Sequence, residues 1–231
     1  MGKVGNSRSV QSNQAGIHPD LDACVRKHLK GGFRRPIAEH TARAFDELVQ
    51  RIAPSSYGLI LDSGCGVGES TLALAQQYPN HWVIGVDQSA KRLAKNAEIS
   101  EANSPLWQNE NALLLRADCV DLWRLARRAG WQLDKHFLLY PNPWPKKRHL
   151  HRRWHGHPVF ADFLALGGDM ELRSNWPTYL QEMQRALELA GRTPSAMEPM
   201  SVSEDTALTP FERKYHCSGQ ALYRLCCTLD G

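Results

Sequence analysis

The chain has 231 residues, of which 42% are hydrophobic and 23% charged; these fractions are near the averages for globular proteins and exclude fibrous and wholly disordered classes. The length suits one domain with one core, because single cores reach about 250 residues before chains divide. A net charge of +4 is only mildly basic, so the total charge does not by itself indicate a polyanionic partner.

The cysteines and the N-terminal segment favour a cytoplasmic protein. The six cysteines form no C-x-x-C pair and suit a reducing compartment better than a disulfide framework. The first residues contain no apolar segment typical of a secretory signal, and no stretch approaches the ~18 apolar residues of a membrane span. We expect residues 1–36 to form a flexible polar and basic segment that precedes one folded domain over residues 37–231.

Helix and strand patterns alternate from residue 37 onward. Apolar residues at helical spacing predict helices over residues 37–52, 70–78, 91–99, 122–129, 158–166 and 178–190. Short apolar runs predict strands over residues 58–62, 81–87, 112–118, 135–140, 169–173 and 221–229. This alternation indicates an α/β fold with a doubly wound, mostly parallel sheet and right-handed crossovers.

A glycine-rich turn follows the first predicted strand. It reads D-S-G-C-G-V-G over residues 62–68, a G-x-G-x-G and not the G-x-G-x-x-G of dinucleotide enzymes. Ligands of such sheets bind beyond the carboxyl ends of the strands, where the strand order reverses. Because glycines let the main chain approach closely, the turn suits a small zwitterion joined to adenosine, with Asp62 facing the ammonium group. An ordinary strand-to-helix turn is the alternative.

Two more carboxylates end the next two predicted strands. Asp87 lies about 20 residues after the last glycine, where a carboxylate can accept hydrogen bonds from both ribose hydroxyls. Asp118 ends the third strand, where it could accept a hydrogen bond from an adenine amino group. Three acids at successive strand ends predict adenosine binding. Since no basic residue stands beside Asp87 to hold a 2′-phosphate, S-adenosylmethionine is favoured over NADP.

A proline-rich and basic segment follows the fourth predicted strand. Residues 140–155 read Y-P-N-P-W-P-K-K-R-H-L-H-R-R-W-H. The X-Pro steps favour extended backbone, which predicts a stiff loop that offers Asn142 and Trp144 to the cofactor pocket. Five Lys or Arg residues with interleaved His and Trp suit phosphate contacts and base stacking; a solvated basic face is the alternative. Without acids or cysteines at ligand spacing, the histidines predict no metal site.

These motifs resemble those of the bacterial tRNA (guanine-N7)-methyltransferases of the TrmB type, which modify guanine 46 in the variable loop. The resemblance covers roughly residues 37–229 and rests on L-D-S-G-C-G-V-G, G-V-D, P-x-P-W-P-K-K-R-H-x-x-R-R, S-N-W-x-x-Y and T-x-F-E. It implies a Rossmann-like class I methyltransferase domain, S-adenosyl-L-methionine as cofactor and tRNA as partner. We expect a monomer or a weak homodimer.

The resemblance also implies roles for individual residues. Contacts to the cofactor would come from Asp62, Gly64, Gly66, Gly68, Asp87, Asp118 and Asn142. Contacts to substrate RNA would come from Lys146, Arg148, Arg152, Arg153, Asn175, Thr209, Pro210, Phe211 and Glu212. Within this second set, residues 148–153 would form the RNA-binding loop and residues 209–212 would close over the target base.

Two positions depart from the family pattern. Asn142 stands at the aspartate of P-D-P-W, which is the position assigned as catalytic, and Asn175 stands at the aspartate of T-D-W. An asparagine can accept a hydrogen bond from guanine but carries no charge, while Glu212 would keep one carboxylate available. We therefore expect a slower guanine-N7 methyltransferase. Methylation of an exocyclic base amine through Asn142-Pro143-Trp144 and a catalytically weak tRNA-binding paralogue are the alternatives.

Overall fold

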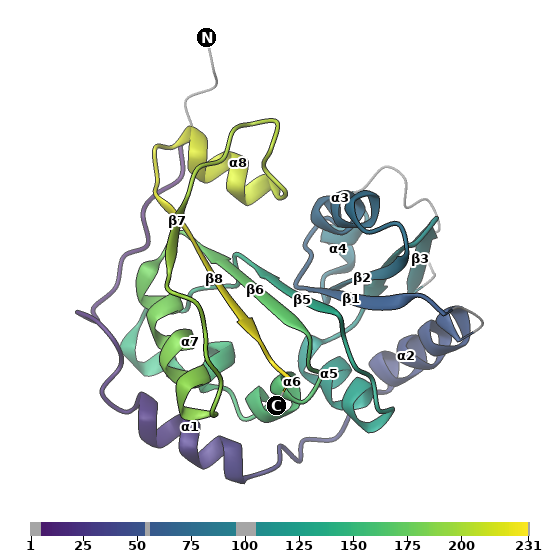
Figure 1. The fold of residues 1–231 in the computed structure, drawn as a ribbon, viewed down its shortest axis with the longest axis horizontal. Helices are drawn as coiled ribbons and strands as arrows, with labels where there is room; N and C mark the ends of the chain where they lie inside the picture. The colour runs from purple at the N-terminus through teal and green to yellow at the C-terminus, as the bar shows by residue number, and fades with distance from the viewer. Residues whose placement is uncertain (1–5, 54–55, 96–104, 231) are drawn as a thin grey trace.

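The computed structural model describes residues 6–53, 56–95 and 105–230 (Figure 1). The described strands form one eight-stranded sheet in the order β3-β4-β2-β1-β5-β6-β8-β7. They are β1 (Gly58–Ser63), β2 (His81–Asp87), β3 (Leu106–Asn109), β4 (Ala112–Arg116), β5 (Lys135–Leu139), β6 (Asp169–Ser174), β7 (Glu198–Met200) and β8 (Leu222–Thr228). The pairs among β4, β2, β1, β5 and β6 are parallel, and β3, β8 and β7 add antiparallel pairs at the two sides. The predicted doubly wound, mostly parallel α/β fold is confirmed.

The helices are α1 (Leu21–Lys30), α2 (Glu39–Ile52), α3 (Glu69–Gln77), α4 (Ala90–Leu93), α5 (Cys119–Arg128), α6 (Phe160–Leu164), α7 (Pro177–Leu189) and α8 (Pro210–Cys217), with 3-10 helices η1 (Lys147–Arg152) and η2 (Trp154–Gly156). Side-chain caps begin helices α5 and α8, which lie beside the cavity described below. The Asp118 carboxylate accepts a hydrogen bond from the Val120 amide at the start of α5, and the Thr209 hydroxyl accepts one from the Glu212 amide at the start of α8.

The sheet buries both of its faces, because successive side chains of a strand point to opposite sides. In β1, Leu61 packs into the larger core cluster, which also contains buried residues of α1, α2, α5, α6 and α7. Its neighbour Ile60 packs instead with Leu74 of α3 in a second cluster. Helices therefore cover both faces of the sheet, as the doubly wound arrangement requires.

Beside β1 the order of the parallel strands reverses. β2 and β4 lie on one side of β1, while β5 and β6 lie on the other. The carboxyl ends of these strands meet at one edge of the sheet, which is where ligands of such folds bind. The loops after β1, β2, β4 and β5 carry the glycine turn, Asp87, Asp118 and the proline-rich segment, so the fold brings these distant parts of the sequence together.

Four short or peripheral elements differ from the sequence-based expectations. The sequence did not predict α1, β3, β7 or α8. The helix expected over residues 91–99 is α4, which ends at Leu93, and residues 96–99 lie outside the described part of the chain.

None of the helices in the described part combines the length and the apolar character that a bilayer crossing needs.

Helix α1 corrects the expectation that residues 1–36 form one flexible segment. Its Leu21 and Val25 are fully buried in the main core, and the helix packs along α7 (Figure 1). Apolar residues at positions 21, 24, 25 and 29 have the spacing of one helical face. Many charged residues stand among them and obscure this pattern in the sequence.

Candidate functional site: a cavity at the carboxyl ends of the strands

A cavity of about 400 Å³ lies at the carboxyl edge of the parallel strands. Its walls come from the glycine turn, the ends of β2, β4 and β6, the proline-rich loop after β5, and residues of α4, η2 and α8. Six residues that the sequence predicted to bind cofactor or RNA line it, namely Gly64, Asp87, Asp118, Asn142, Asn175 and Phe211. The structure thus brings together residues separated by up to 147 positions, as shown by Gly64 and Phe211.

The glycine turn has the backbone that the sequence suggested. Gly64, Gly66 and Gly68 have φ angles of 81°, 65° and 85°, in the left-handed region that strains other residues. At Gly68 a Cβ atom would also lie 2.6 Å from the Leu114 side chain. Gly64 lines the cavity, whereas Gly66 and Gly68 do not. The latter two therefore shape the turn away from the cavity wall.

Asp62 lies beneath this turn and does not line the cavity. Its Oδ2 accepts hydrogen bonds from the hydroxyls of Ser70 and Thr71, at 2.6 and 2.8 Å. Its buried Oδ1 has no hydrogen-bond partner among the described residues. Burial raises the pKa of Asp62 to about 6, so part of the population is protonated near neutral pH. Because its side chain is buried behind the turn, Asp62 does not present its carboxylate to the cavity.

Asp87 ends β2 at the cavity wall, with its side chain only 3% exposed. Its oxygens accept hydrogen bonds from the amides of Ser89 and Gly66, at 2.7 and 3.1 Å. The Nη2 atom of Arg92 lies 3.2 Å from Oδ1. The expectation that no basic residue stands beside Asp87 is therefore wrong, because the first turn of α4 folds Arg92 back onto the carboxylate. The preference for S-adenosylmethionine over NADP therefore has no basis in the absence of a cation beside Asp87.

Asp118 has two structural partners besides its place in the cavity wall. Oδ1 accepts the capping hydrogen bond of α5 from the Val120 amide, at 2.9 Å. Oδ2 accepts a hydrogen bond from Nη2 of Arg35, at 3.0 Å. Arg35 belongs to the segment expected to be flexible, so that segment reaches the cavity wall. A carboxylate has about four acceptor positions, and Asp118 keeps acceptor capacity for a ligand.

The proline-rich loop is more sharply bent than its X-Pro steps predict. Tyr140 and Trp144 each precede a proline, yet their φ angles are 54° and 44°. Positive φ costs a non-glycine residue about 1–3 kcal/mol, and such residues cluster at ligand sites. The two bends place Asn142 in the cavity wall, where its Oδ1 accepts a hydrogen bond from the Trp144 amide at 3.4 Å.

Helix α8 contributes aromatic side chains to the cavity but not its carboxylate. Phe211 and Tyr215 line the cavity, and Phe211 is 46% exposed. Glu212 is fully buried: Oε1 accepts from the Tyr140 hydroxyl and Arg173, and Oε2 accepts from the Leu208 amide. The expectation that Glu212 keeps a carboxylate available to the base is therefore wrong, since folding uses both oxygens.

The remaining predicted substrate residues differ in their accessibility. Asn175 lines the cavity while its amide donates a hydrogen bond to Gln220, and Pro210 is exposed beside the buried cap Thr209. In the basic loop Lys146, Arg148 and Arg152 are exposed, and the Arg152 guanidinium stacks 4.6 Å from the centre of the Trp144 ring.

Arg153 is not part of the exposed basic surface. Its side chain is fully buried, and it donates hydrogen bonds to Glu182, Gln14 and the Trp144 carbonyl. The expectation that it contacts RNA is corrected accordingly, because a phosphate cannot reach it in this fold. A run of basic residues in the sequence does not show which of their side chains is buried in the fold.

The sequence did not identify several residues of the cavity wall, among them Arg92, Tyr140, Trp154 and Tyr215. Tyr140 and Trp154 stood within the basic segment, so the signal was present there. Tyr215 follows Phe211 by one helical turn, and their rings stack at 6.1 Å. That spacing becomes informative only once α8 is known to be a helix.

The chain is similar in sequence to known methyltransferases. Residues 57–225 match a family model described as "Putative methyltransferase". A tRNA (guanine-N(7)-)-methyltransferase of Mycobacterium ulcerans is 31% identical over 217 residues, covering 90% of this chain and 74% of that protein. One of Pseudoalteromonas atlantica is 29% identical over 215 residues, covering 86% and 83%.

Among solved structures, the 16S rRNA methyltransferase KamB has a similar fold, with a TM-score of 0.59. It shares 19% sequence identity and the alignment covers 87% of this chain and 98% of that one. This likeness concerns the Rossmann-like methyltransferase fold alone. The family model matches most of the chain, and a curated tRNA (guanine-N(7)-)-methyltransferase is 31% identical to it. On these grounds the chain belongs to the tRNA (guanine-N7)-methyltransferase family.

Proposed function

We propose that the protein transfers a methyl group from S-adenosyl-L-methionine to N7 of a guanine in tRNA, at position 46 of the variable loop. The observation that carries the proposal is the composition of the cavity that joins the glycine turn to helix α8. Strand-end carboxylates line one part of it, and Tyr140, Phe211 and Tyr215 line another. Carboxylates suit the hydroxyl and amino groups of an adenosine, whereas aromatic rings suit a purine taken out of its stack.

The reaction needs little acid–base chemistry from the protein. Guanine N7 carries an in-plane lone pair and no proton, so a new N7–carbon bond can form as the sulfur–carbon bond of the sulfonium breaks. No proton moves, and the positive charge passes from sulfur to the purine. S-adenosylmethionine supplies the electrophilic methyl group when bound. The residues of this chain then have to hold the two reactants in line and exclude water.

Asp87 and Asp118 would orient the adenosine, and Asn142 would face the base. Asp87 is buried and held by two amide donors, so its carboxylate is fixed in direction. Asn142 stands between prolines in a loop with two positive φ angles, which limits its freedom to move. An amide in that position can accept a hydrogen bond from N1–H or the amino group of guanine, but it does not balance the charge that develops on the purine.

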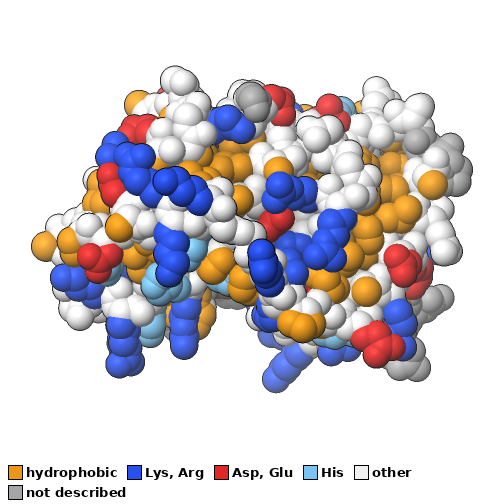
Figure 2. Space-filling model, turned by 90° about the horizontal axis from the view of Figure 1, so that it is seen from below, with side chains coloured by type: hydrophobic (Ala, Val, Ile, Leu, Met, Phe, Trp, Pro, Cys, Tyr) orange, Lys and Arg blue, Asp and Glu red, His pale blue; other side chains and the backbone are white. Residues whose placement is uncertain are grey.

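The basic residues of the proline-rich loop would bind the tRNA backbone. Lys146, Arg148 and Arg152 are exposed and follow the cavity-lining residues directly along the chain. Lys and Arg side chains, with His side chains between them, gather on the face shown in Figure 2, which is the side of the molecule on which α1 lies in Figure 1. Such a surface gives affinity for phosphates without reading sequence.

Incubation of the protein with labelled S-adenosylmethionine and unmodified tRNA tests the proposal. We expect digestion of the product to yield labelled 7-methylguanosine. A label on an exocyclic amine would favour chemistry directed by Asn142 and its neighbouring prolines. Cofactor binding by calorimetry without any methyl transfer would instead indicate a tRNA-binding paralogue, for which the uncharged Asn142 and the engaged Glu212 are the motivating observations.

A further inference from the structure

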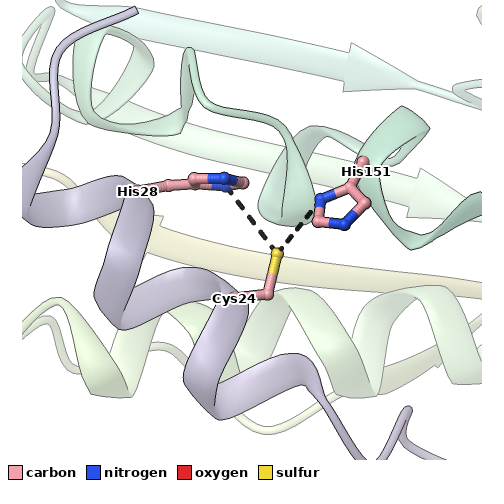
Figure 3. Close-up of side chains that lie close together, drawn as sticks. All are labelled: Cys24, His28 and His151. Atoms are coloured by element: carbon pink, nitrogen blue, oxygen red, sulfur yellow. Dashed lines mark hydrogen bonds between the residues drawn. The ribbon is translucent and has the colours of Figure 1, made fainter.

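Three potential metal ligands converge between α1 and the basic loop, outside the cavity. Cys24 and His28 stand one turn apart on α1, and His151 comes from η1 (Figure 3). The Cys24 sulfur lies 3.7 Å from Nδ1 of His28 and 3.5 Å from Nδ1 of His151. The three donor atoms lie within 4.8 Å of one another.

The two sulfur–nitrogen separations suit a tetrahedral ion. With a zinc–sulfur bond of about 2.3 Å and a zinc–nitrogen bond of about 2.1 Å, tetrahedral geometry places sulfur and nitrogen roughly 3.6 Å apart. Hydrogen bonds donated by the Cys24 thiol do not account for all of the contacts that its sulfur makes. The Cys24 thiol has one proton, while its sulfur faces both imidazole nitrogens and also the Gly156 carbonyl at 3.4 Å.

The surroundings leave the ligands available and the site accessible. In a neutral imidazole one ring nitrogen keeps a lone pair that can bind a metal. Cys24 is buried, whereas His151 is exposed, so an ion could enter from the His151 side. Thiolate and imidazole together are ligands that zinc prefers over magnesium or calcium.

We propose that Cys24, His28 and His151 bind a Zn²⁺ ion, with the fourth position open to water. The histidines of the basic loop predicted no metal site, because no acid or cysteine stands at ligand spacing from them in the sequence. Cys24 precedes His151 by 127 residues, and the fold closes that gap.

The ion would fasten α1 to the basic loop. Two hydrogen bonds already join the N-terminal segment to Lys147 of η1: His18 contacts its carbonyl at 3.1 Å, and the Asn13 side chain accepts from its amide at 3.0 Å. A zinc ion would add a further and stronger link, within one turn of Arg148 and Arg152. An effect on tRNA affinity would rest on the proposed function, whereas zinc binding itself does not.

The test uses the full chain, stripped with a chelator and then titrated with Zn²⁺ or with Co²⁺ as a spectroscopic probe. We expect one ion per chain and a Co²⁺ spectrum with a sulfur-to-cobalt charge-transfer band. His151→Gln, at an exposed position, should weaken binding by at least about ten-fold, the loss that even an outer-shell change causes. Cys24→Ser should abolish the charge-transfer band.

His149→Gln is the matched control, because His149 stands on the same 3-10 helix but outside the cluster. It should bind Zn²⁺ like the wild type, and Zn²⁺ should raise the Tm of both proteins but not of His151→Gln. Failure of the wild type to retain Zn²⁺ on gel filtration would overturn the proposal, as would equal losses in His149→Gln and His151→Gln. Methyl transfer to tRNA by a zinc-free protein would leave the proposed function intact.

Discussion

Arg153 and Glu182 form a fully buried ion pair, in which Nη1 of Arg153 lies 2.5 Å from Oε2 of Glu182. His155 shares the same oxygen at 2.8 Å, and the Gln14 amide donates to the other oxygen at 2.6 Å. Burial alone would raise the pKa of Glu182, but His155 and Arg153 lower it to about 2. The pair joins the basic loop to α7 and to the N-terminal segment.

We expect Arg153→Ala to destabilise the fold by about 3–5 kcal/mol, because it leaves the Glu182 carboxylate buried without its main partner. Urea unfolding measures the change in the free energy of unfolding. Arg152→Ala, the control at the next position, removes an exposed charge and should cost less than about 1 kcal/mol. Equal effects of the two substitutions would contradict the structural role of Arg153.

A second prediction concerns the carboxylate at the end of β2. Asp87→Ala should weaken binding of S-adenosylmethionine by about 1–3 kcal/mol, since a hydrogen bond from a ribose hydroxyl to a carboxylate is charge-assisted. Calorimetry gives the affinity, and Asp46→Ala on the exposed side of α2 is the control. Unchanged affinity in a folded Asp87→Ala protein would remove Asp87 from the cofactor site.

The basic loop should bind tRNA through phosphates. Each phosphate contact contributes about 0.7–0.9 to the slope of log affinity against log salt concentration, so Arg148→Ala with Arg152→Ala should lower that slope by about 1–2. Cofactor affinity should stay the same. Arg43→Ala with Arg51→Ala removes the same charge from exposed positions on α2 and should leave the slope unchanged. A slope that does not respond to the loop substitutions would mean that the loop is a solvated face.

His136 should make the fold sensitive to acid. It is fully buried, its Nε2 lies within hydrogen-bond distance of the Ser63 hydroxyl at 2.8 Å, and burial lowers its pKa to about 3 from an ordinary 6.5. Ser63 lines the cavity and in turn accepts from Nε1 of Trp123 at 3.0 Å. Between these two pKa values the unfolded chain takes up a proton that the folded chain does not, so stability falls as pH falls below 6.5.

By pH 5 the loss from His136 amounts to about 2 kcal/mol. Urea unfolding at pH 7 and pH 5 measures it as the difference between the wild type and His136→Gln. We expect the variant to lose about 2 kcal/mol less than the wild type over this range. The same loss in both proteins would show that other groups account for the acid sensitivity.

The sequence was most informative where local patterns decide structure. The strand at residues 81–87 and its last residue Asp87 were predicted at their observed places, because apolar runs and chain-order alternation determine a parallel sheet. Asp118 was expected to end the third strand, but β4 ends at Arg116 and Asp118 caps α5. Contacts between distant segments could not be predicted in this way. The burial of Arg153 against Glu182, the engagement of Glu212, and the approach of Cys24 to His151 all depend on how α1, α7 and α8 pack.

Substitution of Asn142 distinguishes N7 methylation from the two alternatives. Asn142→Asp changes charge at nearly constant shape, and a carboxylate beside the base would stabilise the cation that forms on the purine. We expect the single-turnover rate of N7 methylation to rise on the order of ten-fold, or about 1.4 kcal/mol, with cofactor affinity little altered. Amine-directed chemistry uses the neutral acceptor, so it predicts a fall in rate, and a paralogue without turnover predicts no gain.

The most direct measurement of the central claim is chemical mapping of the methylated tRNA. Methylation of guanine at N7 makes the base sensitive to borohydride reduction, after which aniline cuts the chain at that nucleotide. Treatment of unmodified tRNA with the protein and S-adenosylmethionine should therefore produce one new cleavage site, at guanine 46. Methyl incorporation without any cleavage would contradict transfer to N7, and cleavage at another guanine would contradict the proposed position.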